Sequence, residues 1–499
     1  MNMRIELNTS SADSYAMFLR IKSLPAYRFS GRSAFVPDQY AAALGVTPVA
    51  DSVNTYVPNH NLYDFQRDIT RMAIERGRYA VFADCGLGKT LIELDFARHV
   101  SKLLGKSKCV LLVTPLMVVP QLLEEADRFY GSTLPIEQIR AAQLPAWLAS
   151  GTSRIGVTNY DALTDAVQQG RLGALILDES SMLKSHYGAW AGHCLRLGRG
   201  LKYKLACTGT PAPNDRIEYA NHAVFLDAFP TVNSFLARYF VNRGQTDNRW
   251  ELKPHALEPF YRAISHWSIF LANPASYGWD LDTSTIPPIN VHLHDIPLTV
   301  EQRDLCYDHT GRLFSDAAGG ITSRSVLSQI AKGNHRGKRV DTNKPAFIRS
   351  LVESWPQEST IIWCRFNAEQ ERIEWELPNA ASISGDTPED DRLQIIHDFK
   401  AGKIKTLISK PKILGFGLNL HVATRQIFSG LQDSYEEYYQ AVKRSNRIGS
   451  KHLLNVHIPM TDIERPMIGT VMRKAKMVQE DTRYQEQLFR SCASAYITT

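Results

Sequence analysis

The chain has 499 residues, of which 44% are apolar and 22% charged, and its formal net charge is +6 at pH 7. This composition is typical of globular proteins, and the length suffices for about three domains. No run approaches the roughly 18 apolar residues needed to cross a bilayer, and no apolar signal segment follows Met1. The cysteines include no Cys-x-x-Cys pair, which disfavours a disulfide framework or a zinc site. We therefore expect a cytoplasmic protein with no membrane partner, whose charge permits a polyanionic partner without requiring one.

The chain begins with a segment that differs from the rest. Residues 27–37 predict a β-hairpin, and residues 38–44 predict a short helix. We expect a small N-terminal module over residues 1–55.

A glycine-hinged loop then follows an apolar run. Residues 79–83 predict a buried strand, residues 91–100 have a helical pattern, and residues 84–90 between them read Asp-Cys-Gly-Leu-Gly-Lys-Thr. This order presents backbone N–H groups and the positive end of a helix to an anion. The segment therefore predicts a site for the phosphates of a nucleoside triphosphate.

The residues of this loop have separate expected tasks. Lys89 is expected to reach the terminal phosphates and the Thr90 hydroxyl to hold Mg²⁺, while Gly86 and Gly88 allow the close backbone approach. The usual pattern has Gly where Ala83 stands. A chance Gly-x-Gly-Lys-Thr turn is therefore the alternative interpretation.

Two adjacent carboxylates follow a later apolar run at residues 174–177. Beside a phosphate loop, Asp178 is expected to hold Mg²⁺ and Glu179 to orient and deprotonate the attacking water. A plain helix N-terminus also favours acidic residues, but the upstream Lys-Thr loop favours the catalytic interpretation. The later sequence Thr-Gly-Thr-Pro at residues 208–211 is, by itself, an ordinary turn.

Buried apolar runs alternate with helical patterns in two parts of the chain. They lie at residues 79–83, 108–119, 155–158, 174–177 and 203–207, and again at 359–363, 405–408 and 425–428. Such runs are typical of parallel strands in α/β domains, so we expect two of these domains. Between them, residues 215–345 predict a mostly helical insertion and linker, whose aromatic side chains we expect to form a packing core rather than to stack on bases. The basic stretch from residue 324 to 349, which overlaps the end of this segment, is either a solvated loop or a nucleic-acid contact.

Together these segments resemble the Swi/Snf-type ATPases of helicase superfamily 2, over about residues 62–450. In that family Ala is normal at position 83, a Gln before the loop reads adenine, and the Thr-Gly-Thr segment couples hydrolysis to movement. The resemblance therefore implies nucleotide contacts from Gln66, Gly86, Leu87, Gly88, Lys89 and Thr90, and coupling by Thr208, Gly209 and Thr210. The acidic pair is followed by Ser180 and Ser181, where the family usually has Ala-His.

The second α/β domain carries the remaining family motifs. Residues 412–420 resemble its Gly-x-Gly-Leu-Asn-Leu motif, and residues 440–449 resemble its final motif. The resemblance implies nucleotide contacts from Gly417 and Gln440. Arg444 and Arg447 are three residues apart, so on a helix they would share a face and point together at a phosphate. The expected contacts with a nucleic-acid backbone are Thr158, Tyr160, Arg365, Lys410 and Lys412.

The resemblance implies two RecA-like parallel-sheet lobes, a mostly helical insertion and the small hairpin-containing module. The expected domains are residues 1–55, a first lobe at 56–225, the insertion and linker at 226–345, a second lobe at 346–465 and a helical tail at 466–499. The hairpin is faintly similar to modules that precede the motor of some DNA-annealing relatives, and a cap on the first lobe is the alternative.

This fold implies an enzyme that uses ATP and Mg²⁺, with the arginines of one lobe completing the ATP site of the other. We expect a monomeric translocase or helicase that moves along double-stranded or branched DNA, in a compact bacterial or bacteriophage form. Duplex translocation, branch migration, annealing and protein displacement all remain open. The alternatives are a phosphotransferase acting on a small molecule, and a nucleic-acid clamp with a vestigial ATPase.

Overall fold

The computed structural model describes residues 2–37, 40–45, 55–184, 188–244, 250–310, 321–414, 419–431 and 435–493. The chain forms two compact units, one of residues 1–283 and 480–499 and the other of residues 284–479. The boundaries therefore differ from those expected, because the segment 226–345 is divided between the two units. No described helix combines the length and the apolar character that a membrane span requires.

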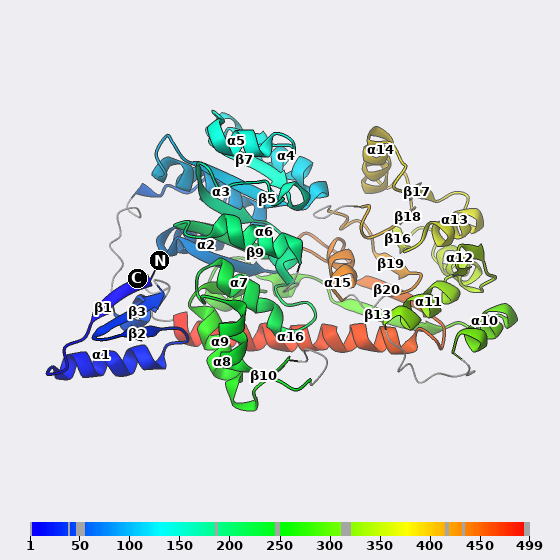
Figure 1. Ribbon diagram of the computed structural model, residues 1–499. Coiled ribbons are helices and arrows are strands. Elements are labelled where there is room, and N and C mark those ends of the chain that lie inside the picture. Colours follow the sequence, from blue (N-terminus) through cyan, green and yellow to red (C-terminus); the bar gives the residue numbers. More distant parts are fainter. Residues whose placement is uncertain are drawn as a thin grey trace. The chain divides into compact units, whose positions relative to one another are not determined.

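The N-terminal module of the first unit is a three-stranded sheet with one helix (Figure 1). Its strands are β1 (Asn2–Glu6), β2 (Arg28–Ser30) and β3 (Ser33–Pro37), in the antiparallel order β1-β3-β2, and its helix is α1 (Ala12–Ser23). The β2–β3 pair confirms the expected hairpin. Of the expected helix at 38–44, the structure has the 3-10 turn Ala42–Leu44, while residues 38 and 39 lie outside the described residues.

The first unit also contains a seven-stranded parallel sheet in the order β12-β4-β9-β8-β5-β7-β6. Its strands are β4 (Arg78–Ala83), β5 (Cys109–Thr114), β6 (Ile136–Gln138), β7 (Ile155–Asn159), β8 (Leu172–Leu177), β9 (Tyr203–Thr208) and β12 (Ser268–Leu271). The helices of the unit are α2 (Asp64–Arg76), α3 (Lys89–Leu103), α4 (Val119–Tyr130), α5 (Leu144–Ser150), α6 (Ala189–Gly198), α7 (Tyr219–Phe225), α8 (Val232–Tyr239) and α9 (Leu257–Ser265). A small pair, β10 (Phe240–Asn242) and β11 (Trp250–Leu252), follows α8.

The strands expected in this unit are present because their apolar runs are buried on both faces. Every residue of β4, β5, β8 and β9 is buried, as expected for a parallel sheet covered by helices on both sides. Strand β12 was not expected, because it lies in the segment interpreted as mostly helical. It pairs with β4 at the edge of the sheet. The aromatic side chains of that segment form a core as expected, since Phe235 and Phe260 are fully buried and pack edge to face at 5.8 Å.

The second unit is built on a six-stranded sheet in the parallel order β13-β20-β19-β16-β18-β17. Its strands are β13 (Ile289–Asp295), β16 (Thr360–Trp363), β17 (Ala381–Ile383), β18 (Thr406–Ser409), β19 (Arg425–Phe428) and β20 (Leu454–Met460). Its helices are α10 (Val300–Thr310), α11 (Ile321–Ala331), α12 (Lys344–Ser354), α13 (Asn367–Glu376), α14 (Glu389–Lys400) and α15 (Tyr435–Lys443), and a hairpin joins β14 (Asn334–His335) to β15 (Lys338–Arg339).

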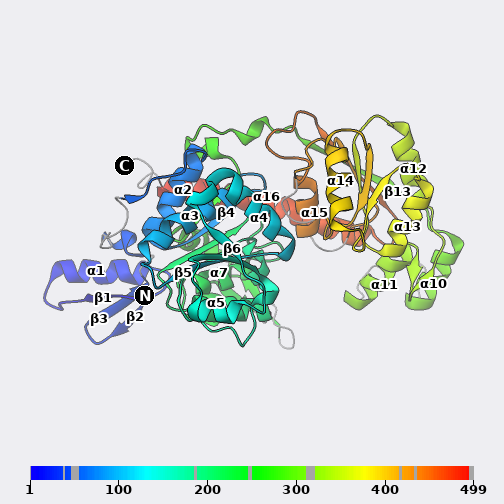
Figure 2. The ribbon, with the colours of Figure 1, turned by 90° about the horizontal axis from the view of Figure 1, so that it is seen from above.

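Alternate residues of this second sheet enter two different cores. Ile361 packs with residues of α14 and α15, whereas its neighbour Ile362 packs with residues of α12 and α13. Figure 2 shows these helix pairs on opposite sides of the sheet. The last helix, α16 (Arg465–Ala493), contributes Val471 to the core of the second unit and Tyr484 to packing in the first. These two sheets are the two RecA-like lobes that the sequence predicted.

Candidate functional site

The glycine-hinged loop lies between the carboxyl end of β4 and the start of α3, as the sequence predicted. Gly86 and Gly88 have φ of 90° and 68°, a left-handed conformation that side chains other than glycine rarely adopt. A Cβ on Gly88 would also collide with the amide nitrogen of Gln66. Helix α3 begins at Lys89, so its N-terminal N–H groups lie where the loop ends.

The side chain of Gln66 stabilises this loop through hydrogen bonds. Its side-chain amide donates to the carbonyl oxygens of Leu87 and Gly88, at 3.1 and 3.3 Å. Its Oε1 accepts from the backbone N–H of Tyr63 at 3.0 Å, at the N-terminus of α2. The side chain is buried and holds the loop, so adenine contact by Gln66 stays a prediction.

The ammonium group of Lys89 lies among negative charges. It donates to the carbonyl oxygen of Ala83 at 3.1 Å. Burial by itself would lower the pKa of Lys89, but the charges of Cys85, Glu179, Asp178 and Asp84 raise it above its ordinary value. Lys89 therefore stays protonated at physiological pH, as a phosphate ligand must.

The two predicted carboxylates lie at the carboxyl end of β8. Asp178 is buried, and its Oδ2 accepts a hydrogen bond from the Thr114 hydroxyl at 2.7 Å. Burial raises the pKa of Asp178, although the Thr114 bond and the Lys89 charge act in the opposite direction. Thr114 ends β5, the neighbouring parallel strand. Sequence reasoning missed Thr114, although a polar residue at the end of that apolar run was the signal for it.

Glu179 connects the acidic pair to the segment predicted to couple hydrolysis to movement. It has a φ of 47°, unusual for a residue with a side chain. Its Oε2 accepts from the Thr208 hydroxyl at 3.3 Å, and the Thr208 oxygen accepts from the backbone N–H of Thr210 at 3.1 Å. A Cβ on Gly209 would lie 3.3 Å from Cys85 Sγ. The Thr-Gly-Thr segment therefore touches both the acidic pair and the phosphate loop.

The departure from the family pattern after Glu179 has a structural counterpart. Ser180 Oγ lies 3.0 Å from Nε2 of the buried His222. Burial lowers the pKa of His222 to about 4, so the ring is neutral at physiological pH. The imidazole of His222, on α7, thus contacts the residue that directly follows the two carboxylates.

These residues fit a nucleoside triphosphate with Mg²⁺. The glycine conformations leave the backbone open to phosphates, and Lys89 supplies a permanent cation. Mg²⁺ is commonly held by one or two protein oxygens together with substrate phosphates, which the Asp178 carboxylate and the Thr90 hydroxyl would provide. All of the residues named for this fit belong to the first unit.

Thr158 and Tyr160 are not positioned for contact with a nucleic acid, and this expectation is corrected. Both are buried. The Thr158 hydroxyl donates to the Ile139 carbonyl at 2.8 Å, and the Tyr160 hydroxyl donates to the Asp178 carbonyl at 2.7 Å. Tyr160 instead holds the backbone that carries the acidic pair.

The two arginines of the last motif have different environments. Helix α15 ends at Lys443, so Arg444 and Arg447 do not share a helical face as expected. Arg444 is buried and donates to the carbonyl oxygens of Leu414 and Pro411, at 2.9 and 3.3 Å. Arg447 is half-buried. Arg444 thus stabilises the loop at residues 411–414. Arg447 is therefore the candidate for phosphate contact.

The nucleotide contacts expected from Gln440 and Gly417 stay predictions. Gln440 is half-buried on α15. Gly417 lies outside the described residues.

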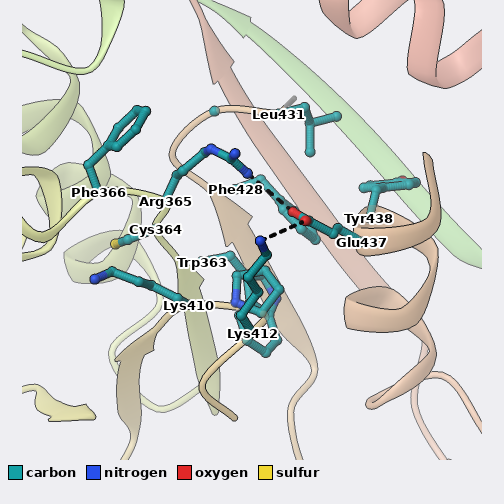
Figure 3. A pocket seen from close by; sticks show the side chains of 12 residues that line it. Trp363, Cys364, Arg365, Phe366, Lys410, Lys412, Phe428, Leu431, Glu437 and Tyr438 are labelled. Atoms are coloured by element: carbon teal, nitrogen blue, oxygen red, sulfur yellow. Dashed lines mark hydrogen bonds and ion pairs between the residues drawn. The ribbon is translucent and has the colours of Figure 1, made fainter. Parts of the chain in front are cut away.

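A pocket in the second unit brings together the other three expected nucleic-acid residues, Arg365, Lys410 and Lys412 (Figure 3). It has a volume of about 220 Å³. Aromatic side chains line it, among them Trp363, Phe366, Phe428 and Tyr438. Because Trp363, Phe428 and Tyr438 are buried, the positive charge is the feature of this pocket that suits a nucleic-acid backbone.

A carboxylate that sequence reasoning missed lies within this pocket. Glu437, in the first turn of α15, is 3.4 Å from an Arg365 guanidinium nitrogen and 3.9 Å from Lys412 Nζ. Figure 3 shows both cations directed at its carboxylate. Only its place one turn before Gln440 in the last motif could have indicated it.

The basic stretch from residue 324 to 349 is partly internal. Lys344 pairs with the buried carboxylate of Glu464 at 2.5 Å, and Lys332 lies 3.9 Å from the same group. Both lysines are buried. These two are therefore neither a solvated loop nor a nucleic-acid contact, while Lys338 and Arg339 are exposed on the β14–β15 hairpin.

Two protein families match the chain. Residues 59–211 match the type III restriction enzyme, res subunit, and residues 343–449 match the helicase conserved C-terminal domain. These segments contain the phosphate loop with the acidic pair, and the last motif. The chain thus has the paired domains of a superfamily 2 helicase. These matches support the resemblance to the Swi/Snf-type ATPases of that superfamily.

Curated relatives agree with this class. The chain is 23% identical to the DNA annealing helicase and endonuclease ZRANB3 of Bos taurus, over 83% of this chain and 40% of the relative. It is 23% identical to the SWI/SNF-related matrix-associated actin-dependent regulator of chromatin subfamily A-like protein 1 of Drosophila melanogaster, over 78% of this chain and 51% of the relative. The chain thus spans about half the length of these relatives or less.

A solved structure was also matched, the SWI2/SNF2 ATPase core of Sulfolobus solfataricus in complex with dsDNA. It is 20% identical, the match covers 87% of this chain and 97% of that chain, and the TM-score is 0.40.

Proposed function

We propose that the protein is an ATP-dependent DNA translocase or helicase, in which hydrolysis of ATP drives movement along double-stranded or branched DNA. The observation that carries this proposal is the hydrogen bond from Thr208 to Glu179. It links the acidic pair to a segment that also packs against the phosphate loop. A simple phosphotransferase has no need of such a link.

The residues divide the chemistry between them. Bound Mg²⁺ supplies a Lewis acid for the phosphates. Lys89 binds the terminal phosphates. The Asp178 carboxylate, which the Thr114 hydroxyl orients, holds the metal ion. Glu179 accepts the proton of the attacking water. Arg447 from the second unit stabilises charge on the transferred phosphoryl group. We propose that hydrolysis uses residues from both units.

The expected partner is DNA, contacted through its backbone by Arg365, Lys410 and Lys412. The matched relatives include a DNA annealing helicase, which favours translocation with branch migration or annealing over transfer of phosphate to a small molecule. We further propose a monomeric, cytoplasmic enzyme of bacterial or bacteriophage origin.

The decisive experiment measures ATP turnover with no nucleic acid and with duplex, forked, four-way-junction and single-stranded DNA. We expect duplex or branched DNA to raise turnover strongly, and Glu179→Gln to abolish hydrolysis while ATP still binds. Turnover unaffected by every nucleic acid would favour a phosphotransferase. Turnover that is negligible and unchanged by Glu179→Gln would favour a clamp with a vestigial ATPase.

A further inference from the structure

The strand pairing of the N-terminal module places an aromatic ring between two arginines on one face of its sheet. Arg4 of β1 and Arg28 of β2 are both directly opposite Phe35 of the central strand β3. Directly paired residues of antiparallel strands share a face. Neighbouring strands lie about 4.8 Å apart, so this row of three side chains spans roughly 10 Å.

This row is accessible. The Arg4 side chain is 64% exposed, Arg28 is exposed and Phe35 is half-buried. The Arg28 guanidinium carbon lies 4.8 Å from the centre of the Phe35 ring, so a planar cation lies over the aromatic face. The opposite face is apolar, since Ala34 and Val36 are fully buried in one cluster with Ile21 of α1.

The charges of the module favour an anionic partner. Over residues 2–37, which form its sheet and helix, the basic residues are Arg4, Arg20, Lys22, Arg28 and Arg32, and the acidic residues are Glu6 and Asp13. Glu6 shares the face of Arg4 and pairs with it, and Glu6 Oε1 also accepts a hydrogen bond from Ser33 at 2.8 Å. A phosphate approaching Arg4 must therefore compete with the Glu6 carboxylate.

We propose that the Arg4–Phe35–Arg28 face of the N-terminal module binds single-stranded nucleic acid. Unpaired bases stack on the Arg28–Phe35 layer, and the two guanidinium groups contact the phosphates on either side. Open sheet faces that combine aromatic rings with basic side chains bind single strands in this way, because every base has a face that can stack. A duplex keeps its bases inside and offers only phosphates, so it gains less from the ring.

Binding of a fluorescent 15-nucleotide oligo-dT to the full chain, followed by anisotropy at several salt concentrations, tests this proposal. Phe35→Thr should weaken binding about tenfold or more, and Arg28→Gln should also lower the salt slope by about 0.7. Glu6→Gln should strengthen binding, because it removes the competing carboxylate. Lys22→Gln, an equal loss of charge on the exposed surface of α1, should leave binding nearly unchanged.

Glu6→Gln should change oligo-dT affinity in the opposite direction from Phe35→Thr and Arg28→Gln. A misfolded module could not bind more tightly, so this result distinguishes a binding effect from misfolding. Ultraviolet crosslinking of the bound oligonucleotide should label the peptide that contains Phe35. Oligo-dT affinity unchanged in both Phe35→Thr and Arg28→Gln would overturn the proposal, as would an equal loss of duplex affinity. ATP hydrolysis stimulated by duplex should survive in all these variants, so failure here would leave the proposed motor function standing.

Discussion

The hydroxyl of Thr208 donates a hydrogen bond to the carboxylate of Glu179 across 3.3 Å. This contact joins the end of β9 to the second residue after β8, and Thr210 fixes the hydroxyl through its backbone N–H. The sequence resemblance predicted a coupling segment here, and the structure supplies a physical contact for it. The carboxylate that we propose to orient the attacking water is thus itself oriented from a neighbouring strand.

Thr208→Ala should lower the kcat of DNA-stimulated ATP hydrolysis roughly ten- to a hundredfold. A hydrogen bond to a charged group contributes about 1.5–3 kcal/mol, and each 1.36 kcal/mol corresponds to tenfold in rate. Thr208→Ser, which keeps the hydroxyl, should retain most activity. Steady-state kinetics check this, with binding of a fluorescent ATP analogue expected to change little. Equal activity of Thr208→Ala and the wild type would show that the contact has no part in hydrolysis.

Arg444→Gln and Arg447→Gln should separate stability from catalysis. Arg444 is buried against two backbone carbonyls, so its loss should cost about 2–3 kcal/mol of unfolding free energy. Arg447→Gln should leave stability within about 0.5 kcal/mol and lower kcat by about a thousandfold. Urea unfolding and ATPase assays measure the two effects. Loss of hydrolysis in a stable Arg444→Gln protein would instead assign the catalytic contact to Arg444.

Much of the first unit could be predicted, because its signals are local. The phosphate loop, the acidic pair and the apolar strands each lie within a few consecutive residues. Arg444 and Tyr160 could not be placed, since a motif gives the residue type but not whether its side chain turns inward. Strand β12 was missed because a short apolar run beside helical patterns is ambiguous. The Glu437 contact joins residues far apart in the chain, which no spacing reveals.

Glu437→Gln should strengthen DNA binding several-fold. Its carboxylate pairs with Arg365 and lies near Lys412, where a backbone phosphate is expected, so it competes with the DNA. Glu436→Gln is a matched control, because Glu436 is the preceding residue of the same helix and does not line the pocket. Duplex titrations at increasing salt provide the measurement. Equal strengthening in both variants would indicate a general charge effect rather than competition within the pocket.

Acid should weaken the fold through buried histidines such as His222. Because burial lowers its pKa from 6.5 to about 4, its stabilising contribution is complete above pH 6.5 and falls as the pH drops towards 4. At pH 5 the loss from one such histidine is about 2 kcal/mol. Urea unfolding of His222→Asn should therefore show a smaller loss of stability between pH 7 and pH 5 than the wild type. His255→Asn, at an exposed position of the same unit, should lose as much as the wild type. An unchanged loss in His222→Asn would contradict this origin of the acid sensitivity.

We propose that ATP hydrolysis drives movement along duplex DNA. Displacement of a third strand from a DNA triplex tests it most directly, because a translocating protein removes that strand without separating the duplex. We predict displacement by the wild type that requires ATP, a flanking duplex and Mg²⁺, with none by Glu179→Gln. Rapid DNA-stimulated hydrolysis without displacement, or displacement that persists without ATP, would contradict movement driven by ATP hydrolysis.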